Sequence, residues 1–316
     1  MDWSAIYGYP ARTLTIIANK GFITTLTAAI SSYLLSILIK KDTAEKGYGV
    51  AISCNLFRYA SFMFLFLSGL LEINHQFLTR FPDTGLNNLY LMLYVPAFTF
   101  LGYMALKRFA EYMPDWKIST AVVTASLVVY LIFGQEFFNA QYIMLVQHKA
   151  SALHFIAHWI GAIFVAALFY QLILSAKDNL TDDLQNGSAW ILAGAIVMFL
   201  SIEMCLANNQ LFYSAGKDLD SMETNYIKVG LPILWGLSSF ALMWLGMRNK
   251  ERTLRIISLT LFSITLIKLF VFDIRNIPPA GKIAAFFCLG VLLLIISFMY
   301  QKVKKIIVDD GTDKHI

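Results

Sequence analysis

Residues 253–273 read TLRIISLTLFSITLIKLFVFD, residues 276–282 read NIPPAGK, and residues 283–305 read IAAFFCLGVLLLIISFMYQKVKK. The two long stretches are apolar and close to the length of about 20 residues that crosses a bilayer as a helix. A Pro-Pro turn joins them, and a basic cluster follows the second. Lys268 and Asp273 place charge within the first stretch. This hairpin predicts a protein with several membrane spans that holds charge inside its membrane domain.

The composition of the whole chain supports the same class of protein. Of the 316 residues, 58% are hydrophobic and 14% are charged, whereas soluble domains carry about 25% charged residues. A chain in lipid has to satisfy its own backbone hydrogen bonds, which leaves helices and closed barrels, and these apolar runs lack the alternation of barrel strands. We therefore expect an all-α, polytopic bundle. The chain has a net charge of +5, and its Lys and Arg residues lie largely in short loops, where they orient a membrane protein. We therefore expect a lipid bilayer as partner and no nucleic acid.

Nine apolar windows of spanning length follow one another along the chain. We place them at residues 21–39, 50–73, 88–106, 118–134, 152–175, 188–206, 226–246, 254–273 and 280–301. Lys and Arg are richest in the connections after windows one, three and seven and in the C-terminal tail. Because basic residues favour the cytoplasmic side, this pattern predicts the N-terminus outside and the C-terminus inside. We expect an interfacial outer tail over 1–20, a single transmembrane domain over 21–303 and a cytoplasmic tail over 304–316.

Three further patterns bear on how the bundle works. The longer connections, residues 76–87, 135–151 and 207–225, fall on the predicted outer side and are the expected places for partner contacts. Pro96 and Pro232 lie inside spans, where they kink helices either beside a cavity or for packing alone. The ends of windows two and six resemble each other, which indicates either a transporter-like repeat of windows two to five over six to nine or a chance likeness.

Ionisable residues inside the spans are the main functional signal. Each costs roughly 2.5–3.5 kcal/mol on insertion scales, so such groups usually face the bundle interior. The candidate residues for a polar cavity are Glu203, Lys268, Asp273, His154, His158, Lys228, Glu72 and Arg58. Most of them fall in the outer half of the membrane under the predicted topology.

Glu203 and Lys268 are the two candidates least able to reach water. Their helices run outward, and side chains lean toward the N-terminus of a helix, so both groups lean toward the membrane centre. We expect each to find a partner on another helix, either within one shared polar site or in a structural ion pair that fixes packing. Lys228 and His154 stand at helix starts and can extend into the interface instead. Arg58, with Asn55 one turn before it, has the same option on the inner side.

No catalytic or metal signature accompanies these charges. The motifs G-x-x-x-x-G-K-[ST], G-x-S-x-G, H-E-x-x-H and C-x-x-C are absent from the sequence, so no catalytic residue is assigned. His154 and His158 are one helical turn apart, a spacing that suits a metal or haem ligand pair. No third ligand stands at a matching local spacing, and we expect a polar edge of the cavity rather than a metal or cofactor site.

The C-terminal part carries a set of spaced motif residues. They are Trp235, Gly246-Met247-Arg248, Arg255, IKLFVFD at 267–273, Lys282, FFCLG at 286–290 and YQK at 300–302. Over residues 231–305 the chain resembles DUF2339, a family of bacterial predicted membrane proteins. The resemblance implies a bacterial inner-membrane location and puts Lys268 and Asp273 at motif positions, but it implies no activity. Family members usually have Arg where Lys282 stands. They are also usually longer, so two expectations stay open: that the chain is a complete, shorter member or that it is a piece of a longer one.

Three functions fit these patterns. The first is a carrier of the cell envelope that binds a lipid, glycan or small molecule in a polar cavity. The second is a structural or assembly subunit whose outer loops bind a membrane protein partner. The third is an intramembrane enzyme acting on a lipid-linked or glycan substrate, with Glu203 or His158 as general base.

Overall fold

The structure, a computed structural model, describes most of the apolar part of the chain. The described residues are 6–7, 13–41, 53–108, 115–214 and 216–269, with isolated residues between 279 and 297. Every regular element within them is a helix, which confirms the all-α class. Contacts between Cα atoms group the chain into two compact units, Met1–Leu172 and Ile173–Ile316. Asp273, most of the ninth predicted span and the predicted tail 304–316 lie outside the described residues.

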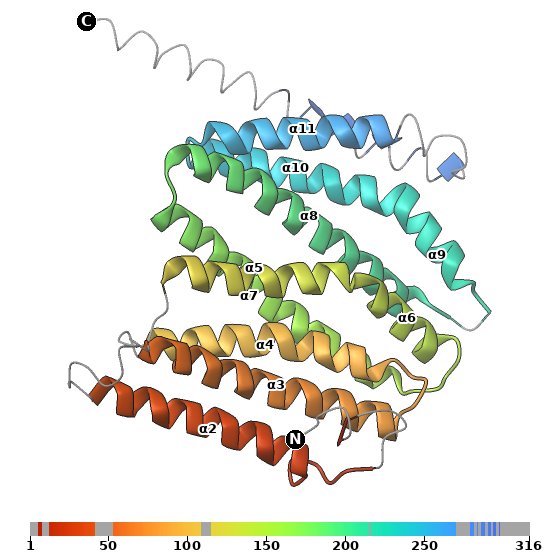
Figure 1. The fold of residues 1–316 in the computed structure, drawn as a ribbon. Helices are drawn as coiled ribbons and strands as arrows, with labels where there is room; N and C mark the ends of the chain where they lie inside the picture. Colours follow the sequence, from red (N-terminus) through yellow and green to blue (C-terminus); the bar gives the residue numbers. More distant parts are fainter. Residues whose placement is uncertain are drawn as a thin grey trace, which may run out of the picture. The chain divides into compact units, whose positions relative to one another are not determined.

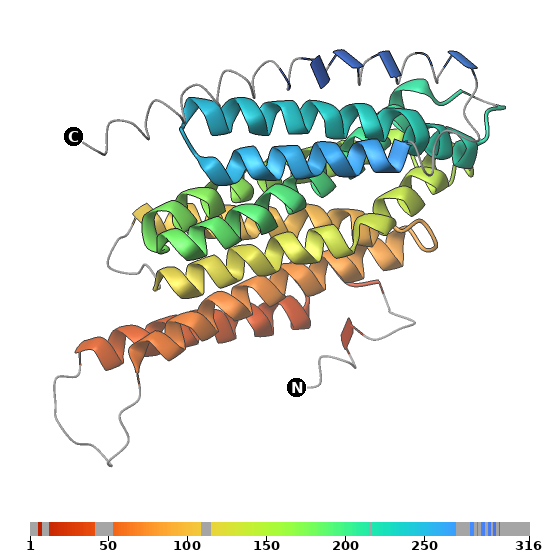
Figure 2. The ribbon, with the colours of Figure 1, turned by 90° about the horizontal axis from the view of Figure 1, so that it is seen from above.

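Unit 1 begins with three long helices that follow one another in space. They are α2 (Lys20–Lys41), α3 (Cys54–Arg80) and α4 (Leu86–Arg108). Figure 1 and Figure 2 both show α2 and α3 lying side by side, and α4 packs against α3. The Ser61 hydroxyl donates to the Ala29 carbonyl (2.7 Å), and the Tyr94 hydroxyl donates to the Phe66 carbonyl (3.0 Å). These bonds join neighbouring helices through small or hydroxylated residues, as expected where lipid supplies no hydrophobic force between them.

The rest of unit 1 contains a broken helix where one span and one loop were predicted. Its elements are α5 (Trp116–Ile132), α6 (Gly134–Leu145), the short 3-10 helix η2 (Ala152–Phe155) and the first part of α7 (Ile156–Asn179). The prediction of a connection over 135–151 was wrong for residues 135–145, since α6 occupies them at an angle of 44° to α5. The helix buries Phe137, Ala140, Gln141 and Met144 and carries polar residues between them, and with 12 residues it is too short to span a membrane alone.

Unit 2 is organised around a helical hairpin. Its elements are α8 (Asp182–Phe212), α9 (Leu219–Asn225), the π-helix η3 (Tyr226–Gly230), α10 (Leu231–Arg248) and α11 (Arg252–Lys268). The hydroxyl of Ser239 donates to the carbonyl of Ser258 and the hydroxyl of Ser258 donates to the carbonyl of Ser239, both at 2.8 Å. A Cβ atom added at Gly246 would lie 3.0 Å from the backbone nitrogen of Arg255. Small residues therefore let α10 and α11 approach closely.

Two helix starts in unit 2 have identifiable local causes. Asp218 caps α9 by accepting hydrogen bonds from the Ser221 hydroxyl (2.6 Å) and amide (3.1 Å). The hydroxyl bond in particular lowers the pKa of Asp218 below its usual range. The π-helix η3 ends just before Pro232, which lacks the N–H that a regular helix would use at that position.

The number of long apolar helices is somewhat lower than predicted. Six helical segments of the described residues are long and apolar enough to span a membrane, or seven if α5 and α6 form one broken span. The eighth predicted window corresponds to α11, whose described part has 17 residues. The connections are also shorter than expected, because α3 continues to Arg80 and α8 continues to Phe212. The topology of the spans, the single-domain organisation and the internal repeat stay predictions.

Candidate functional site

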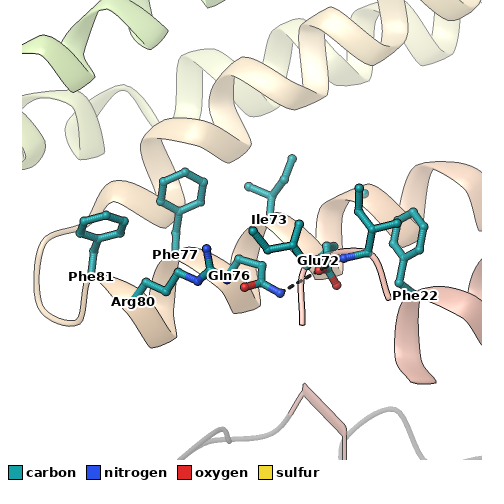
Figure 3. A pocket seen from close by; sticks show the side chains of 10 residues that line it. Phe22, Glu72, Ile73, Gln76, Phe77, Arg80 and Phe81 are labelled. Carbon is teal, nitrogen blue, oxygen red and sulfur yellow. Dashed lines mark hydrogen bonds between the residues drawn. The ribbon is translucent and has the colours of Figure 1, made fainter. Parts of the chain in front are cut away.

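A cavity of about 390 Å³ lies in unit 1 along the last three turns of α3 (Figure 3). One wall is the face of α3 that carries Gly69, Ile73 and Phe77, and the chain before α2 supplies the other side. The apolar side chains that line it are Ile16, Ile17, Phe22, Ile73, Phe77 and Phe81. The polar ones are Glu72, Gln76 and Arg80. Because these α3 positions recur every three or four residues, they share one face of the helix.

The Glu72 carboxylate is buried at the centre of a hydrogen-bond network. Its Oε1 accepts from the Ile17 amide (2.9 Å) and from Gln76 Nε2 (2.8 Å). Its Oε2 accepts from Asn19 Nδ2 (2.7 Å) and, over a longer distance, from the Tyr7 hydroxyl (3.5 Å). A carboxylate offers about four acceptor sites, so the protein itself supplies donors for all of them. Glu72 therefore fastens the chain before α2 to the face of α3.

The segment before α2 is shaped to meet this carboxylate. Asn19 caps α2 by accepting a hydrogen bond from the Phe22 amide (2.9 Å), the usual role of Asn at a helix start. Ile17 has a φ of +62°, an uncommon conformation for a β-branched residue, and it turns its amide toward Glu72. Burial first, and then the charge of Glu72, raise the pKa of Tyr7 to about 12. The Tyr7 phenol thus stays protonated and keeps its role as a donor.

Gln76 and Arg80 are the polar residues of the cavity that can still form hydrogen bonds with a ligand. Gln76 Nε2 donates to Glu72 and to the Leu14 carbonyl (3.3 Å), whereas its buried Oε1 has no hydrogen-bond partner among the described residues. Figure 3 shows this amide between the Glu72 carboxylate and the Arg80 guanidinium, with its oxygen on the Arg80 side. Arg80 is exposed.

The two predicted histidines of the fifth window have different surroundings. Nδ1 of His154 lies 3.0 Å from the Tyr90 hydroxyl, and the His154 ring meets Phe81 edge-on at 5.8 Å between centroids. Tyr90 in turn stacks on Phe77 at 4.1 Å. His154 therefore stands behind the aromatic wall of the cavity, in contact with Phe81 and linked to Phe77 through Tyr90.

His158 is enclosed in an aromatic core of unit 1. Its ring centroid lies 4.3 Å from that of Phe137 and 4.9 Å from that of Phe155. Its Nδ1 lies 3.4 Å from the Tyr130 hydroxyl, and only 1% of the residue is exposed. Within the described ranges no group of three or more His, Cys, Asp or Glu side chains is placed to hold a metal ion.

Unit 2 carries three of the other predicted residues. Lys268 Nζ donates to the carbonyl of Ile227 in η3 at 2.8 Å, so one of its contacts with another helical element is to a backbone oxygen. Lys228 lies in the same π-helix and is partly exposed. Glu203 is buried on α8, two residues after Ser201. The shared site of Glu203 and Lys268 stays a prediction.

The polar residues around Glu203 form hydrogen bonds between the elements of unit 2. The Tyr226 hydroxyl donates to the Ser201 carbonyl (3.3 Å), and Trp235 Nε1 donates to the Ser201 hydroxyl (3.0 Å). About two turns further along α8 than Ser201, Asn209 Nδ2 donates to Glu223 (3.0 Å). In unit 1, Arg58 Nη1 donates to Asn55 Oδ1 (3.3 Å).

Sequence reasoning identified Glu72 but missed the groups that complete the cavity. Gln76 and Asn19 are neutral, so a search for intramembrane charge passes over them. Arg80 reads as an ordinary loop cation until α3 is seen to continue to it. The available signal was the helical spacing of Glu72, Gln76 and Arg80, four residues apart each time.

Comparison with known proteins gives a family and no activity. No curated protein and no solved structure matches the chain. A family model described as "Predicted membrane protein (DUF2339)" matches residues 1–303, nearly the whole chain. The chain therefore belongs to the DUF2339 family of predicted membrane proteins.

Proposed function

We propose that the protein is a carrier of the bacterial cell envelope, located in the inner membrane, which binds its ligand among its helices and opens toward each side in turn. The α3 cavity is the observation that carries the proposal. Its volume of about 390 Å³ falls at the lower end of the range of roughly 300–1,000 Å³ for ligand sites, and it has their mostly apolar walls with a few polar groups. A cavity of this kind supports a binding role more than a purely structural one.

A structural or assembly subunit is the second candidate, and specific contacts favour it. The Glu72 carboxylate accepts hydrogen bonds from donors of the protein itself, and Lys268 donates to a backbone carbonyl. Both charged side chains thus hold neighbouring segments of the protein together. The third candidate, an enzyme with His158 as base, gains no support from the aromatic enclosure of that ring.

Thiol labelling from the two sides of the membrane separates the first two candidates. Ile73→Cys places a thiol on the cavity wall, in a background where the three native cysteines are replaced by Ala. Spheroplasts and inverted membrane vesicles are each treated with a membrane-impermeant maleimide. A carrier gives labelling in both preparations, because the cavity opens to water on each side in turn. Labelling from one side, or from neither, refutes the carrier and leaves the structural subunit.

The matched control is a thiol that faces away from the interior of the unit. Ile163 on α7 is 68% exposed, and an exposed isoleucine on an apolar helix is in contact with lipid. Ile163→Cys should stay unlabelled in both preparations, because the maleimide needs an ionised thiol in water. Labelling of this control would show that the maleimide reaches thiols within the membrane, and labelling of Ile73→Cys from both sides would then not support the carrier.

A further inference from the structure

We propose that the α3 cavity binds an anionic lipid head group, a phosphate ester of a polyol whose apolar chain lies against the aromatic side of the cavity. The phosphate contacts Arg80, and a hydroxyl of the polyol donates to Gln76 Oε1. The inference rests on the proposed function, since it names the class of molecule that the carrier holds.

The Glu72 network decides which groups a ligand meets. Three donors at 2.7–2.9 Å and the more distant Tyr7 hydroxyl at 3.5 Å surround the Glu72 oxygens and take up most of their acceptor capacity. The carboxylate is therefore held by the protein itself and has little acceptor capacity to offer a ligand. The polar capacity that remains is the acceptor Oε1 of Gln76 and the donors of Arg80.

Gln76 Oε1 calls for a donor that arrives with the ligand. A buried acceptor without a partner costs about 1–3 kcal/mol, and Gln76 is only 8% exposed. Both of its amide protons already point to protein oxygens, on Glu72 and Leu14. The oxygen itself is closed off from solvent, so the amide has to turn toward the cavity for a ligand hydroxyl to satisfy it.

Arg80 supplies the charge that selects an anion. Its guanidinium presents a planar fork of donors that matches a phosphate. Arg80 and Gln76 are four residues apart, roughly 6 Å along the helix axis from the rise per residue. A phosphate and a nearby hydroxyl on one short polyol are spaced to reach both groups.

The apolar rim selects a chain rather than a free sugar phosphate. Ile16, Ile17 and Phe81 are 53%, 57% and 41% exposed, so apolar surface continues from the cavity to the outside of unit 1. Apolar area of this kind is stabilised by contact with an acyl chain. The cavity volume of about 390 Å³ holds a head group and the start of one chain, and the remainder of the lipid stays in the bilayer.

Lipid titrations followed by native mass spectrometry test the assignment. The full chain, delipidated in a non-ionic detergent, is titrated with phosphatidylglycerol and with phosphatidylmethanol, which has the phosphate ester but no hydroxyl. We expect phosphatidylglycerol to bind about three- to tenfold more tightly, the contribution of one neutral hydrogen bond. Arg80→Gln should weaken both lipids by at least about tenfold, whereas Arg108→Gln, at the far end of α4, should weaken neither.

Two substitutions at Gln76 keep the test independent of folding. Gln76→Leu and Gln76→Lys both remove the acceptor, and the lysine retains a donor for Glu72. In each, the preference for phosphatidylglycerol over phosphatidylmethanol should disappear. A preference that survives in both variants, or equal losses from Arg80→Gln and Arg108→Gln, overturns the assignment. Displacement of the lipid by free glycerol phosphate at similar concentration overturns the lipid part and identifies a soluble polyol phosphate.

This test and the labelling test fail separately. A cavity that opens to one side only, yet prefers phosphatidylglycerol through Gln76, refutes the carrier and leaves the head-group site. Labelling of Ile73→Cys from both sides without any head-group preference refutes the site assignment and leaves the carrier.

Discussion

Replacing Glu72 by Gln should release the chain before α2 from α3 without unfolding unit 1. The substitution keeps the size of the side chain but removes its charge and turns one of its two acceptor oxygens into a donor. The donors that now approach the carboxylate most closely belong to Asn19 (2.7 Å), Gln76 (2.8 Å) and Ile17 (2.9 Å). An amide at position 72 cannot accept from all three, so at least one buried donor loses its partner.

The size of the effect follows from these bonds. A hydrogen bond to a charged group contributes about 1.5–3 kcal/mol, and the losses do not add because the freed donors turn to water. We expect the free energy of local opening around Ile17 to fall by about 2–4 kcal/mol, which speeds exchange of its amide roughly 30- to 1,000-fold. The helices of unit 1 retain their own contacts, so their exchange should change little.

Hydrogen exchange with single-residue fragmentation measures this directly. Ile17 is compared between the wild type and Glu72→Gln in the same detergent, with amides in the middle of α4 as the internal reference. Glu136→Gln is the matched control, because Glu136 also accepts an amide hydrogen bond, from Asn88 at 2.9 Å, but far from this segment in sequence. Unchanged exchange at Ile17 in Glu72→Gln, or equal acceleration in Glu136→Gln, would refute the reasoning.

Three further predictions concern unit 2. Gly246→Ala should destabilise the α10–α11 hairpin by about 1–3 kcal/mol through overpacking against a backbone nitrogen, whereas Gly187→Ala, which meets no atom within 4 Å, should be neutral or stabilising in a thermal melt. Ser239→Ala and Ser258→Ala should each cost less than about 2 kcal/mol, and the double variant should cost less than their sum; strict additivity would show that the reciprocal bonds are not coupled. Because hydrogen bonding lowers the pKa of Asp218, its cap is fully present above its unfolded-state pKa and is lost as the pH falls through the lower folded value. Exchange at the start of α9 should therefore accelerate only at such acidic pH, and Asp218→Asn should remove the dependence.

The sequence was most informative where helices are apolar throughout. The windows at 21–39, 88–106 and 188–206 fall inside α2, α4 and α8, because burial in lipid demands a continuous apolar surface. The same criterion failed at α6, where polar residues alternate with the buried face. It also ended α3 and α8 too early, since both helices continue into polar turns. Hydropathy reports what surrounds a helix, whereas hydrogen bonding along the backbone decides where it stops.

The site was harder to predict because its charged side chains contact neutral side chains and backbone groups that are distant in the sequence. Glu72 was a candidate because it is a charged residue within a predicted span, but its partners come from a segment more than 50 residues earlier. Nothing local in the sequence marks Asn19 or the Ile17 amide as donors for a distant carboxylate. The contact of Lys268 with Ile227 likewise depends on η3, and only Pro232 hints at an irregular turn there.

Charge within these helices is balanced in part by neutral donors and acceptors, and this changes where a ligand site is to be sought. Glu72 accepts hydrogen bonds from amides and a phenol, and Lys268 donates to a carbonyl. A charge satisfied in this way is costly to disturb and has little left to offer a ligand. Gln76 donates hydrogen bonds to Glu72 and to the Leu14 carbonyl, whereas its buried Oε1 accepts none from the described residues. The unused neutral oxygen beside Arg80 is therefore a better guide to the ligand than the buried carboxylate.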